Sequence, residues 1–358
     1  MSSTACLNDS LSSFTPTEFS PIRWRNRRLE LLDQRQLPHQ VEWLSYADAN
    51  DVAQAITDMV VRGAPAIGIT AAYGVVLSIL KHQDALISGS TNNLKSDIQA
   101  LAQSRPTAIN LHWALDRMSA LIDTTEPQQL VSRLAEEAIA IHQQDIDFCH
   151  QIGQHGASLI SEGSQVYTHC NAGALATGGH GTALGVIRTA FGQNKISQVY
   201  AGETRPWFQG ARLTSWELLE EGIPTFLVTE GAAGHTLKHN KVDWVIVGSD
   251  RIAADGSVAN KIGTYNLAIL ARHHGCKVMV AAPSSTFDLS IQNGNDIPIE
   301  QRPTDEVTHY KQSAIAADGV KAINPSFDVT PPELVDVIVT ERGIIHNPST
   351  ETIKAHFA

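Results

Sequence analysis

Hydrophobic and polar residues follow a helical period in the first part of the chain. Val52, Ile56 and Val60 recur at the spacing that places side chains on one face of a helix. Gly63 is suited to end that helix, and Pro65 to open the next one. Helices are predicted at 50–60, from 65 to about 75, at 110–122 and at 127–160, and a few short strands within 22–44. This part of the chain therefore predicts a mainly helical domain.

The second part of the chain has a different pattern, in which short runs rich in Val and Ile alternate with helical stretches. The runs are at 165–169, 198–201, 225–229, 244–248, 278–282 and 335–340, and helices are predicted at 182–191, 214–221 and 262–273. This alternation indicates a parallel sheet with both faces covered, in which ligands bind beyond the carboxyl ends of the strands. The residues at those ends are Cys170, Glu203, Glu230, Asp250, Pro283 and Glu341.

These patterns predict an α/β fold in three parts. We expect an extension without stable structure at 1–20, a small mainly helical domain at 21–162, and a Rossmann-like catalytic domain with a parallel sheet at 163–358. The extension is rich in Ser and Thr and lacks the basic start and apolar stretch of a signal peptide. We also expect no later stretch to be long and apolar enough to span a membrane. The interpretation is a cytoplasmic protein without a membrane partner.

Charge and cysteine usage narrow the function classes. The net charge is −11, from 26 basic and 37 acidic residues, and no long basic run is present, which disfavours a nucleic-acid partner. The four cysteines form no CxxC pair, which argues against a zinc site or disulfide framework and suits a reducing compartment. His235 and His239 lie four residues apart, but no third ligand is near in sequence, so we predict no metal site.

The segment 168–185, Thr-His-Cys-Asn-Ala-Gly-Ala-Leu-Ala-Thr-Gly-Gly-His-Gly-Thr-Ala-Leu-Gly, leads from a predicted strand to a helix. Its small residues let backbone N–H groups approach an anion, and the helix N-terminus favours negative charge. Cys170, directly after the strand, is thus a candidate reactive group, whereas Cys149 and Cys276 are interpreted as packing residues. The glycines at 179, 181 and 185 also resemble a dinucleotide fingerprint, but they lie too far past the strand, which leaves a dehydrogenase as a minor alternative.

The segment 245–261 brings a second set of polar residues to the same edge of the predicted sheet. An apolar strand leads to Asp250, which is placed for proton transfer, although a structural pair with Arg251 is the alternative. Asp255-Gly256 is interpreted as a turn. Lys261, beside Asn260, is a candidate phosphate ligand.

Two further segments are candidates for binding an anionic substrate. Arg62 lies in Arg-Gly-Ala-Pro-Ala-Ile-Gly between two predicted helices, where a guanidinium group can hold a phosphate with two hydrogen bonds. The segment 203–212, Glu-Thr-Arg-Pro-Trp-Phe-Gln-Gly-Ala-Arg, is rich in polar donors directly after a strand, which is typical of a polar substrate pocket.

Together these motifs resemble the methylthioribose-1-phosphate isomerases, relatives of the alpha, beta and delta subunits of translation initiation factor 2B. The resemblance covers about 22–345 and rests on the segments quoted above and on Ala-Pro-Ser-Ser-Thr-Phe-Asp at 282–288 and Asn-Pro-Ser-Phe-Asp at 324–328. It implies conversion of 5-methylthioribose 1-phosphate to 5-methylthioribulose 1-phosphate in methionine salvage, without a cofactor, by a homodimer. It also implies Asp250 as general acid/base, Cys170 as the group that stabilises the transition state, and substrate contacts from Arg62, Gly63, Ala64, Arg105, Gln209, Asn260 and Lys261.

The chain departs from this family where Thr-Asp-Asn commonly follows the third strand of the sheet. Here the sequence is Thr229-Glu-Gly231, with one more methylene and without the amide, so we expect a changed pocket wall or dimer contact. Two alternatives stay open. One is an isomerase of another 1-phosphosugar, ribose 1,5-bisphosphate or 5-deoxyribose 1-phosphate, and the other is a non-catalytic regulatory subunit like those of initiation factor 2B.

Overall fold

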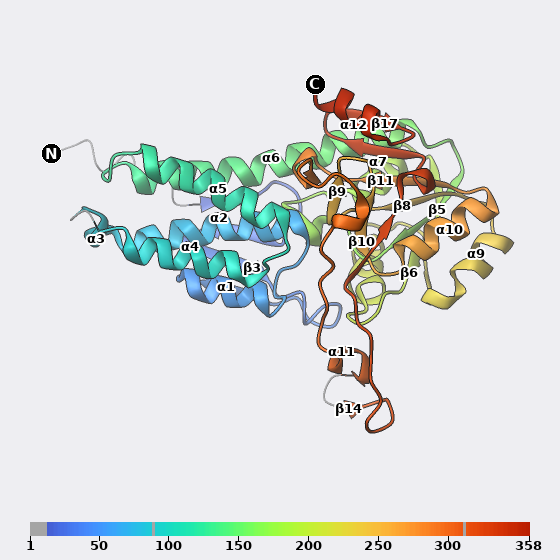
Figure 1. Ribbon diagram of the computed structural model, residues 1–358, viewed down its shortest axis with the longest axis horizontal. Helices are drawn as coiled ribbons and strands as arrows, with labels where there is room; N and C mark the ends of the chain where they lie inside the picture. Colours follow the sequence, from blue (N-terminus) through green and yellow to red (C-terminus); the bar gives the residue numbers. More distant parts are fainter. Residues whose placement is uncertain (1–12, 88–89, 311–312) are drawn as a thin grey trace. The chain divides into compact units, whose positions relative to one another are not determined.

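The computed structural model describes residues 13–87, 90–310 and 313–358 (Figure 1). The chain forms two compact units, one made of residues up to His150 with 173–181, the other of 151–172 with 182–358. This division differs from the predicted boundary between 162 and 163. One long helix contributes to both units, and the loop 173–181 packs within the first unit although its flanks belong to the second.

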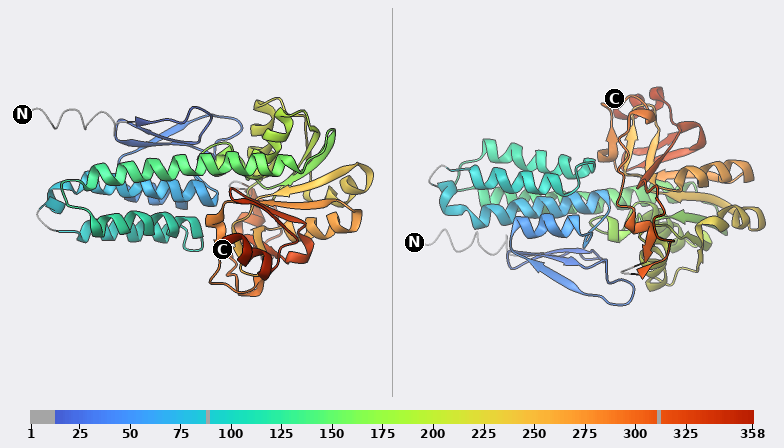
Figure 2. Two further views of the ribbon diagram at one scale, coloured as in Figure 1. Left: turned by 90° about the horizontal axis from the view of Figure 1, so that it is seen from above. Right: turned by 60° about the horizontal axis from the view of Figure 1, so that its bottom comes forward.

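The first unit contains a bundle of helices. Those at 49–57, 64–81, 109–124 and 130–158 correspond to helices predicted from the helical period, whereas those at 83–87 and 92–104 were not predicted. Their bounds are α1 (Ala49–Thr57), α2 (Ala64–Lys81), α3 (Gln83–Ile87), α4 (Asn92–Ser104), α5 (Ile109–Thr124) and α6 (Leu130–Ser158). Figure 2 shows the longer helices lying side by side. Val52 and Ile56, on the predicted helical face of α1, are buried with Leu101 and Leu111 in one continuous apolar core, so that predicted face is the one that packs.

Helix α2 corrects the expectation that no stretch is long and apolar enough to cross a membrane. Its 18 residues pass that test by length and composition, but 83% of them are buried inside the protein. The helix is apolar on nearly all sides because α1, α4 and α5 surround it, and a helix buried on all sides needs no polar face.

A four-stranded antiparallel sheet packs against the bundle and confirms the strands predicted within 22–44. Its strands, in order, are β1 (Ser13–Phe14), β2 (Ile22–Arg25), β3 (Arg28–Leu32) and β4 (Trp43–Tyr46). The first strand lies inside the predicted extension, and Phe14 pairs with Trp24. The regular structure therefore begins before residue 21, because this strand completes the sheet edge; residues 1–12 lie outside the described part.

The second unit is built on the predicted parallel sheet. The strand order is β17 (Gly343–His346), β16 (Val337–Thr340), β11 (Lys277–Ala281), β8 (Val242–Val247), β5 (Ser164–His169), β6 (Ile196–Gly202) and β7 (Thr225–Val228). All six predicted runs are strands, and they are parallel to their neighbours. Only β17, which was not predicted, is antiparallel.

Helices cover both faces of this sheet, as the buried strands require. One face carries α9 (Ala233–His239), α10 (Thr264–His274) and α12 (Thr350–Phe357), and the other α7 (Ala183–Gly192), α8 (Ser215–Glu220) and the end of α6. Within β8, Val245 and Val247 face the first layer, while Trp244 and Ile246 face the second. Each strand therefore buries both sets of side chains, which explains why its sequence is apolar throughout.

A smaller four-stranded sheet follows the carboxyl end of β8. It consists of β12 (Phe287–Asp288), β9 (Arg251–Ala253), β10 (Val258–Lys261) and β15 (Phe327–Thr330). The chain between β12 and β15 carries α11 (Asp305–Thr308), β13 (His309–Tyr310) and β14 (Ser313–Ala314), which Figure 1 shows as an excursion from the sheet. Asp255-Gly256 forms the turn between β9 and β10, as predicted, with the Ser257 N–H donating to the Asp255 carboxylate over 2.8 Å.

Candidate active site

The order of the strands places two predicted residues at the centre of the sheet edge. Taken along the chain, the six parallel strands are arranged 3-2-1-4-5-6, the order of dinucleotide-binding folds. The order reverses between β5 and β8, which are hydrogen-bonded neighbours. Cys170 directly follows β5, and Asp250 lies three residues after β8. Both therefore lie at the switch point, where crevices for ligands form in such sheets.

A buried polar network fixes the backbone at Cys170. The residue has φ +60°, an uncommon conformation for a side chain other than glycine, and its carbonyl accepts a hydrogen bond from the Thr214 hydroxyl. The next side chain, Asn171, is buried and donates to Glu217 over 2.9 Å. Glu217 in turn pairs with Arg188 at 2.6 Å, with little exposure of either side chain. The half-buried Cys170 is thus held by charged and polar groups behind it.

The ends of β5 and β8 are in direct contact. A β-carbon at Gly248 would lie 2.6 Å from the Ala172 β-carbon, so only glycine permits this approach. Beyond it, the Asp250 N–H donates to the Ala259 carbonyl over 2.9 Å, which ties the segment after β8 to β10. Arg251, the alternative structural partner of Asp250, forms an ion pair with Asp288 at 3.4 Å.

Strand β10 brings Asn260 and Lys261 to the same edge. The buried Asn260 amide donates to the Thr264 hydroxyl over 3.0 Å, and the Lys261 ammonium lies 5.0 Å from the centre of the Phe327 ring. The Asp328 carboxylate caps the start of α10 by accepting from the N–H groups of Gly263 and Tyr265 over 2.7 and 3.0 Å. Burial raises the pKa of Asp328 to about 6, although Lys261 acts in the opposite direction.

His169, the last residue of β5, is buried and close to this helix start. Burial lowers its pKa to about 4, so the imidazole is neutral at neutral pH and its Nε2–H donates to the Ile262 carbonyl over 2.9 Å. This contact joins β5, which Cys170 directly follows, to Ile262, which directly follows Lys261.

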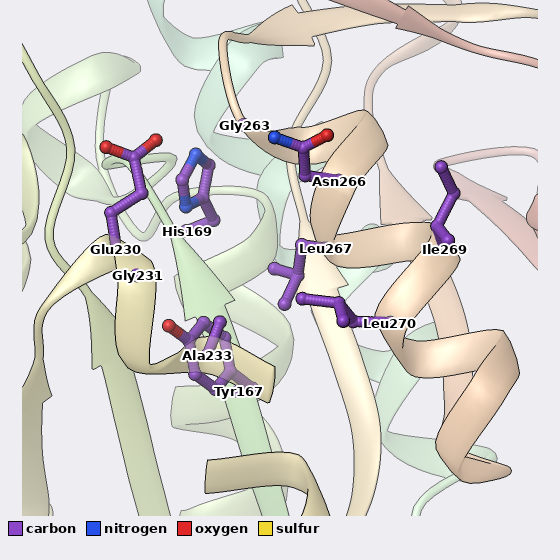
Figure 3. Close-up of a pocket in the computed structure, with 10 residues that line it drawn as sticks. All are labelled: Tyr167, His169, Glu230, Gly231, Ala233, Gly263, Asn266, Leu267, Ile269 and Leu270. Carbon is purple, nitrogen blue, oxygen red and sulfur yellow. The ribbon is translucent and has the colours of Figure 1, made fainter. Parts of the chain in front are cut away.

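A pocket of about 340 Å³ opens beside His169 and contains the residue at which the chain departs from the family pattern. Figure 3 shows the Glu230 carboxylate beside the His169 ring, with Gly263 and Asn266 opposite and Leu267 and Leu270 deeper along α10. Burial raises the pKa of Glu230, and the negative charges of Glu203 and Asp328 add to that effect. A β-carbon at Gly263 would lie 2.6 Å from a Glu230 oxygen, so Glu230 forms part of the pocket wall.

The loop after β6 carries Gln209 and packs close to the strand end. Gln209 is buried, and its side-chain oxygen accepts from the Thr204 hydroxyl over 2.7 Å. Glu203 accepts from the N–H of Thr204 over 2.6 Å, and burial raises the pKa of its carboxyl. Of the five predicted residues of the second unit, Cys170, Gln209 and Asp250 therefore lie after strands β5, β6 and β8 of the parallel sheet, whereas Asn260 and Lys261 end strand β10 of the smaller sheet.

The other predicted substrate contacts belong to the first unit. Gly63 has φ +98° and precedes α2, with Arg62 nearly buried on one side and Ala64 buried on the other. A β-carbon at Gly63 would lie 2.5 Å from Ala176, in the loop that begins three residues after Cys170. Arg105 ends α4, and its carbonyl accepts from the Ala108 N–H over 3.0 Å.

Comparison with known proteins shows the family of the chain. The model of the initiation factor 2 subunit family matches residues 60–347. The chain belongs to this family. Among curated members it is similar to the methylthioribose-1-phosphate isomerase of Alcanivorax borkumensis, with 51% identity over 94% of this chain and 96% of that protein. The enzyme of the same name from Alkalilimnicola ehrlichii is 53% identical over 90% and 93% of the two chains.

Solved structures of family members share the fold over nearly the whole chain. The 5-methylthioribose 1-phosphate isomerase of Pyrococcus horikoshii has a TM-score of 0.88 and 36% identity, over 98% of this chain and 97% of that one. A structure described as the delta subunit of translation initiation factor eIF-2B from A. fulgidus has a TM-score of 0.81 and 39% identity, over 96% and 99% of the two chains. The predicted family and fold class are therefore confirmed.

Several residues that shape the site were missed in the sequence. Glu217 and Arg188 fix the Cys170 turn, but they lie on helices as ordinary charged residues and have no local signal. Asp328 is part of the Asn-Pro-Ser-Phe-Asp segment that supported the family resemblance. Membership of that motif was the signal in the sequence that could have indicated a role for Asp328 in the site. The capping of α10 by Asp328 depends on the pairing of β10 with β15, which brings Asp328 to Gly263 although they are 65 residues apart in the chain.

Proposed function

We propose that the protein is an aldose–ketose isomerase of methionine salvage that converts 5-methylthioribose 1-phosphate to 5-methylthioribulose 1-phosphate. The observation that carries the proposal is the position of Cys170 and Asp250 at the ends of adjacent strands β5 and β8, where the strand order reverses. Relatives about half identical over nearly the full chain bear the name of this enzyme.

The chemistry assigns different roles to the two residues. The phosphate on C1 locks the sugar as a ring, so the ring oxygen must first gain a proton, and hydrogen must then move from C2 to C1. Asp250 serves as the general acid/base, and Cys170 stabilises the transition state. The route by enediolate loses deuterium from C2 to solvent, whereas a direct hydride shift keeps it, so label retention in the product distinguishes the two routes.

The substrate contacts remain proposals from the family resemblance. Arg62, Arg105 and Lys261 hold the phosphate, since guanidinium and ammonium groups bind its oxygens with charge-assisted hydrogen bonds. Gly63 and Ala64 offer backbone N–H groups, and Gln209 and Asn260 contact the sugar hydroxyls. Among the second-unit residues, the burial and fixed orientation of Gln209 and Asn260 support this assignment, because a rigid amide discriminates between hydroxyl positions.

The test is turnover of 5-methylthioribose 1-phosphate by the purified protein, with Cys170→Ser and Asp250→Asn prepared alongside. We expect ketose product from the wild type and a loss of kcat of at least about 100-fold in each folded variant, as for removal of a proton-transfer group. Cys276→Ser and Asp147→Asn are matched controls that should keep wild-type kcat, because Cys276 is a buried packing residue and Asp147 is exposed on α6. Full activity in Asp250→Asn would overturn the assigned role of Asp250, and no wild-type turnover would overturn the proposed substrate.

A non-catalytic role is the second candidate, because a structure described as an initiation-factor subunit is 39% identical to this chain. Such a subunit would bind a sugar phosphate or nucleotide without converting it. Other 1-phosphosugars, ribose 1,5-bisphosphate and 5-deoxyribose 1-phosphate, are the alternative substrates of an isomerase. Product analysis with all three sugars, and binding analysis without turnover, separates these outcomes.

We further propose that the protein is a cytoplasmic homodimer. Strand β7 is the last strand of the large sheet, and Phe226 and Leu227 on it are 60% and 51% exposed. Exposed apolar side chains on a sheet edge are typical of surfaces that a second chain covers. The molar mass from light scattering tests this: a dimeric wild type and a monomeric Phe226→Asp variant support it, and a monomeric wild type contradicts it.

A further inference from the structure

Two histidines and a glutamate from distant parts of the sequence meet in the first unit, and side chains of these types can ligate a metal ion. They are Glu18 before the buried Ser20, His150 near the end of α6, and His180 in the loop 173–181. Their ligand atoms all lie within 4.8 Å of one another. Among the residues that the structure describes, no other group of three or more His, Cys, Asp or Glu side chains converges in this way.

The geometry within this cluster is close to that of a coordination sphere. His150 Nε2 is 2.9 Å from one oxygen of Glu18, and His180 Nδ1 is 3.7 Å from the other. The two imidazole rings lie 4.0 Å apart between centroids. Zinc bound tetrahedrally at about 2.0–2.1 Å from each ligand holds ligand atoms about 3.4 Å from one another, so small side-chain rotations suffice.

One side of the cluster of Glu18, His150 and His180 is accessible to solvent, and the backbone at Gly179 covers the other side. The side chain of His180 is 13% exposed, that of Glu18 30% and that of His150 48%. Behind it, Gly179 lies against the Glu18 carboxylate: a β-carbon there would be 3.4 Å from the same oxygen that contacts His150. Three protein ligands with solvent access to the fourth position match zinc sites of the two-histidine, one-carboxylate type.

We propose that Glu18, His150 and His180 bind one Zn²⁺ ion per chain. The ion fastens the segment around residue 18 to α6 and to the loop that begins three residues after Cys170. Sequence spacing predicted no metal site, because Glu18 and His150 are 132 residues apart and only the fold brings them together. Imidazole and carboxylate ligands also accept Co²⁺ and Ni²⁺, which supply spectroscopic probes of the same site.

A second pair of histidines provides a matched control. His235 and His239 lie one turn apart on α9, with ring centroids 4.4 Å apart, but no third ligand joins them among the described residues. A histidine pair of this kind can hold zinc weakly, so it measures the background binding that two imidazoles provide.

The experiment measures zinc binding to the full-length chain after chelator treatment, by calorimetry and by metal analysis of the desalted protein. The background carries Cys6→Ser and Cys170→Ser, so that neither thiol binds the ion. We expect one Zn²⁺ per chain, and binding weakened at least about tenfold in both Glu18→Gln and His150→Ala, because removal of even an outer partner of a zinc ligand costs 10–100-fold. The double variant His235→Ala/His239→Ala should keep full affinity.

Hydrogen exchange locates the ion independently of affinity. Zinc should slow exchange of the amides in 176–181 in the background protein and not in His150→Ala, whose half-exposed side chain is removable without loss of the fold. The proposal is overturned by absence of retained zinc, or by zinc binding that survives in His150→Ala and disappears in His235→Ala/His239→Ala. Zinc that binds without slowing exchange in 176–181 overturns the fastening role.

Discussion

Two pairs of a histidine and an aspartate, one in each unit, hold a glycine-containing turn in the same way. In the first unit, His142 Nε2 is 2.9 Å from the Gly178 carbonyl and the Gly178 N–H is 2.6 Å from the Asp145 carboxylate. In the second, His169 contacts the Ile262 carbonyl and Asp328 accepts from the Gly263 N–H. Each pair satisfies both polar groups of a turn near a proposed site residue, which keeps that backbone in one conformation.

The two aspartates differ in pKa, whereas the two histidines have similar pKa values. Burial raises the pKa of Asp145 to about 7 and that of Asp328 to about 6. The smaller rise at Asp328 follows first from its less complete burial; this carboxylate also accepts a second backbone hydrogen bond, from Tyr265, and lies near Lys261. Burial lowers the pKa of both histidines to about 4. The same hydrogen-bond pattern therefore gives a different dependence of stability on pH in each unit.

The largest expected effect is that of Asp145→Asn on the pH dependence of stability. The pKa of Asp145 rises from 3.8 in an unfolded chain to about 7 in the fold, so the folded state holds the proton more tightly. Its contribution is therefore complete below pH 4 and is lost as the pH rises through 7, which amounts to about 4 kcal/mol. Asp145→Asn removes this loss. Urea unfolding at pH 4 to 8 gives the free energy of unfolding at each pH, and its slope against pH should differ between the variant and the wild type.

Any effect of the amide group that Asp145→Asn introduces changes the free energy of unfolding by the same amount at every pH. A change in the slope of that free energy against pH therefore reports only the charge of the Asp145 carboxyl group. Asp147→Asn is the matched control, because Asp147 lies on the same helix but is exposed and bonded to Gln143. An Asp145→Asn variant with the wild-type slope would show that the carboxyl titrates in the fold as it does in the unfolded chain.

The next effect tests whether the two histidines are equivalent. The pKa of His142 and that of His169 fall from 6.5 to about 4, so each contributes stability that is present above pH 6.5 and is lost as the pH falls through 4. The loss is about 3 kcal/mol for each. In His142→Gln and in His169→Gln, whose amides can still donate to the carbonyl, this acid loss should disappear to the same extent.

Exposed His112→Gln is the control for general effects of losing a histidine. Urea unfolding between pH 4 and 7 gives the comparison. Unequal slopes in the two variants would mean that one imidazole reaches solvent or gains a proton in the fold. In the wild type, stability rises with pH because of His142 and falls with pH because of Asp145, so the two effects partly cancel between pH 4 and 6.5. A variant that lacks one of these groups therefore shows the pH dependence of the other.

The sequence predicted the elements on which these pairs depend, but not the pairs. The helical period identified α6, and the apolar runs identified β5, so the residues at strand ends followed from the rule for parallel sheets. His142 and Asp145 lie three residues apart on α6 and face the core together, yet their partner Gly178 is determined by the path of the loop 173–181. That path depends on packing between segments far apart in the chain.

Other features escaped prediction for reasons that the structure identifies. Strand β17 was missed because its four residues have little alternation, and it forms by antiparallel pairing with β16. The apolar helix α2 was predicted only in part, since its burial on all sides leaves no period to mark its end. Local patterns thus predicted elements and strand ends, whereas contacts between distant segments depend on the tertiary fold.

The smallest expected effect is that of Asp328→Asn, because Asp328 has the smaller pKa shift of the two aspartates. The pKa of Asp328 rises from 3.8 to about 6, so its contribution is complete below pH 4 and is lost as the pH rises through 6. The shift corresponds to about 3 kcal/mol, which partial exposure of the carboxylate reduces to about 2 kcal/mol. Urea unfolding should show a smaller change of slope than Asp145→Asn gives, confined to a window about one pH unit lower. A change as large as that of Asp145→Asn would mean that Lys261 and the Tyr265 amide do not stabilise the charged form. No change would mean that water reaches the carboxylate, and the second turn would then be held independently of pH.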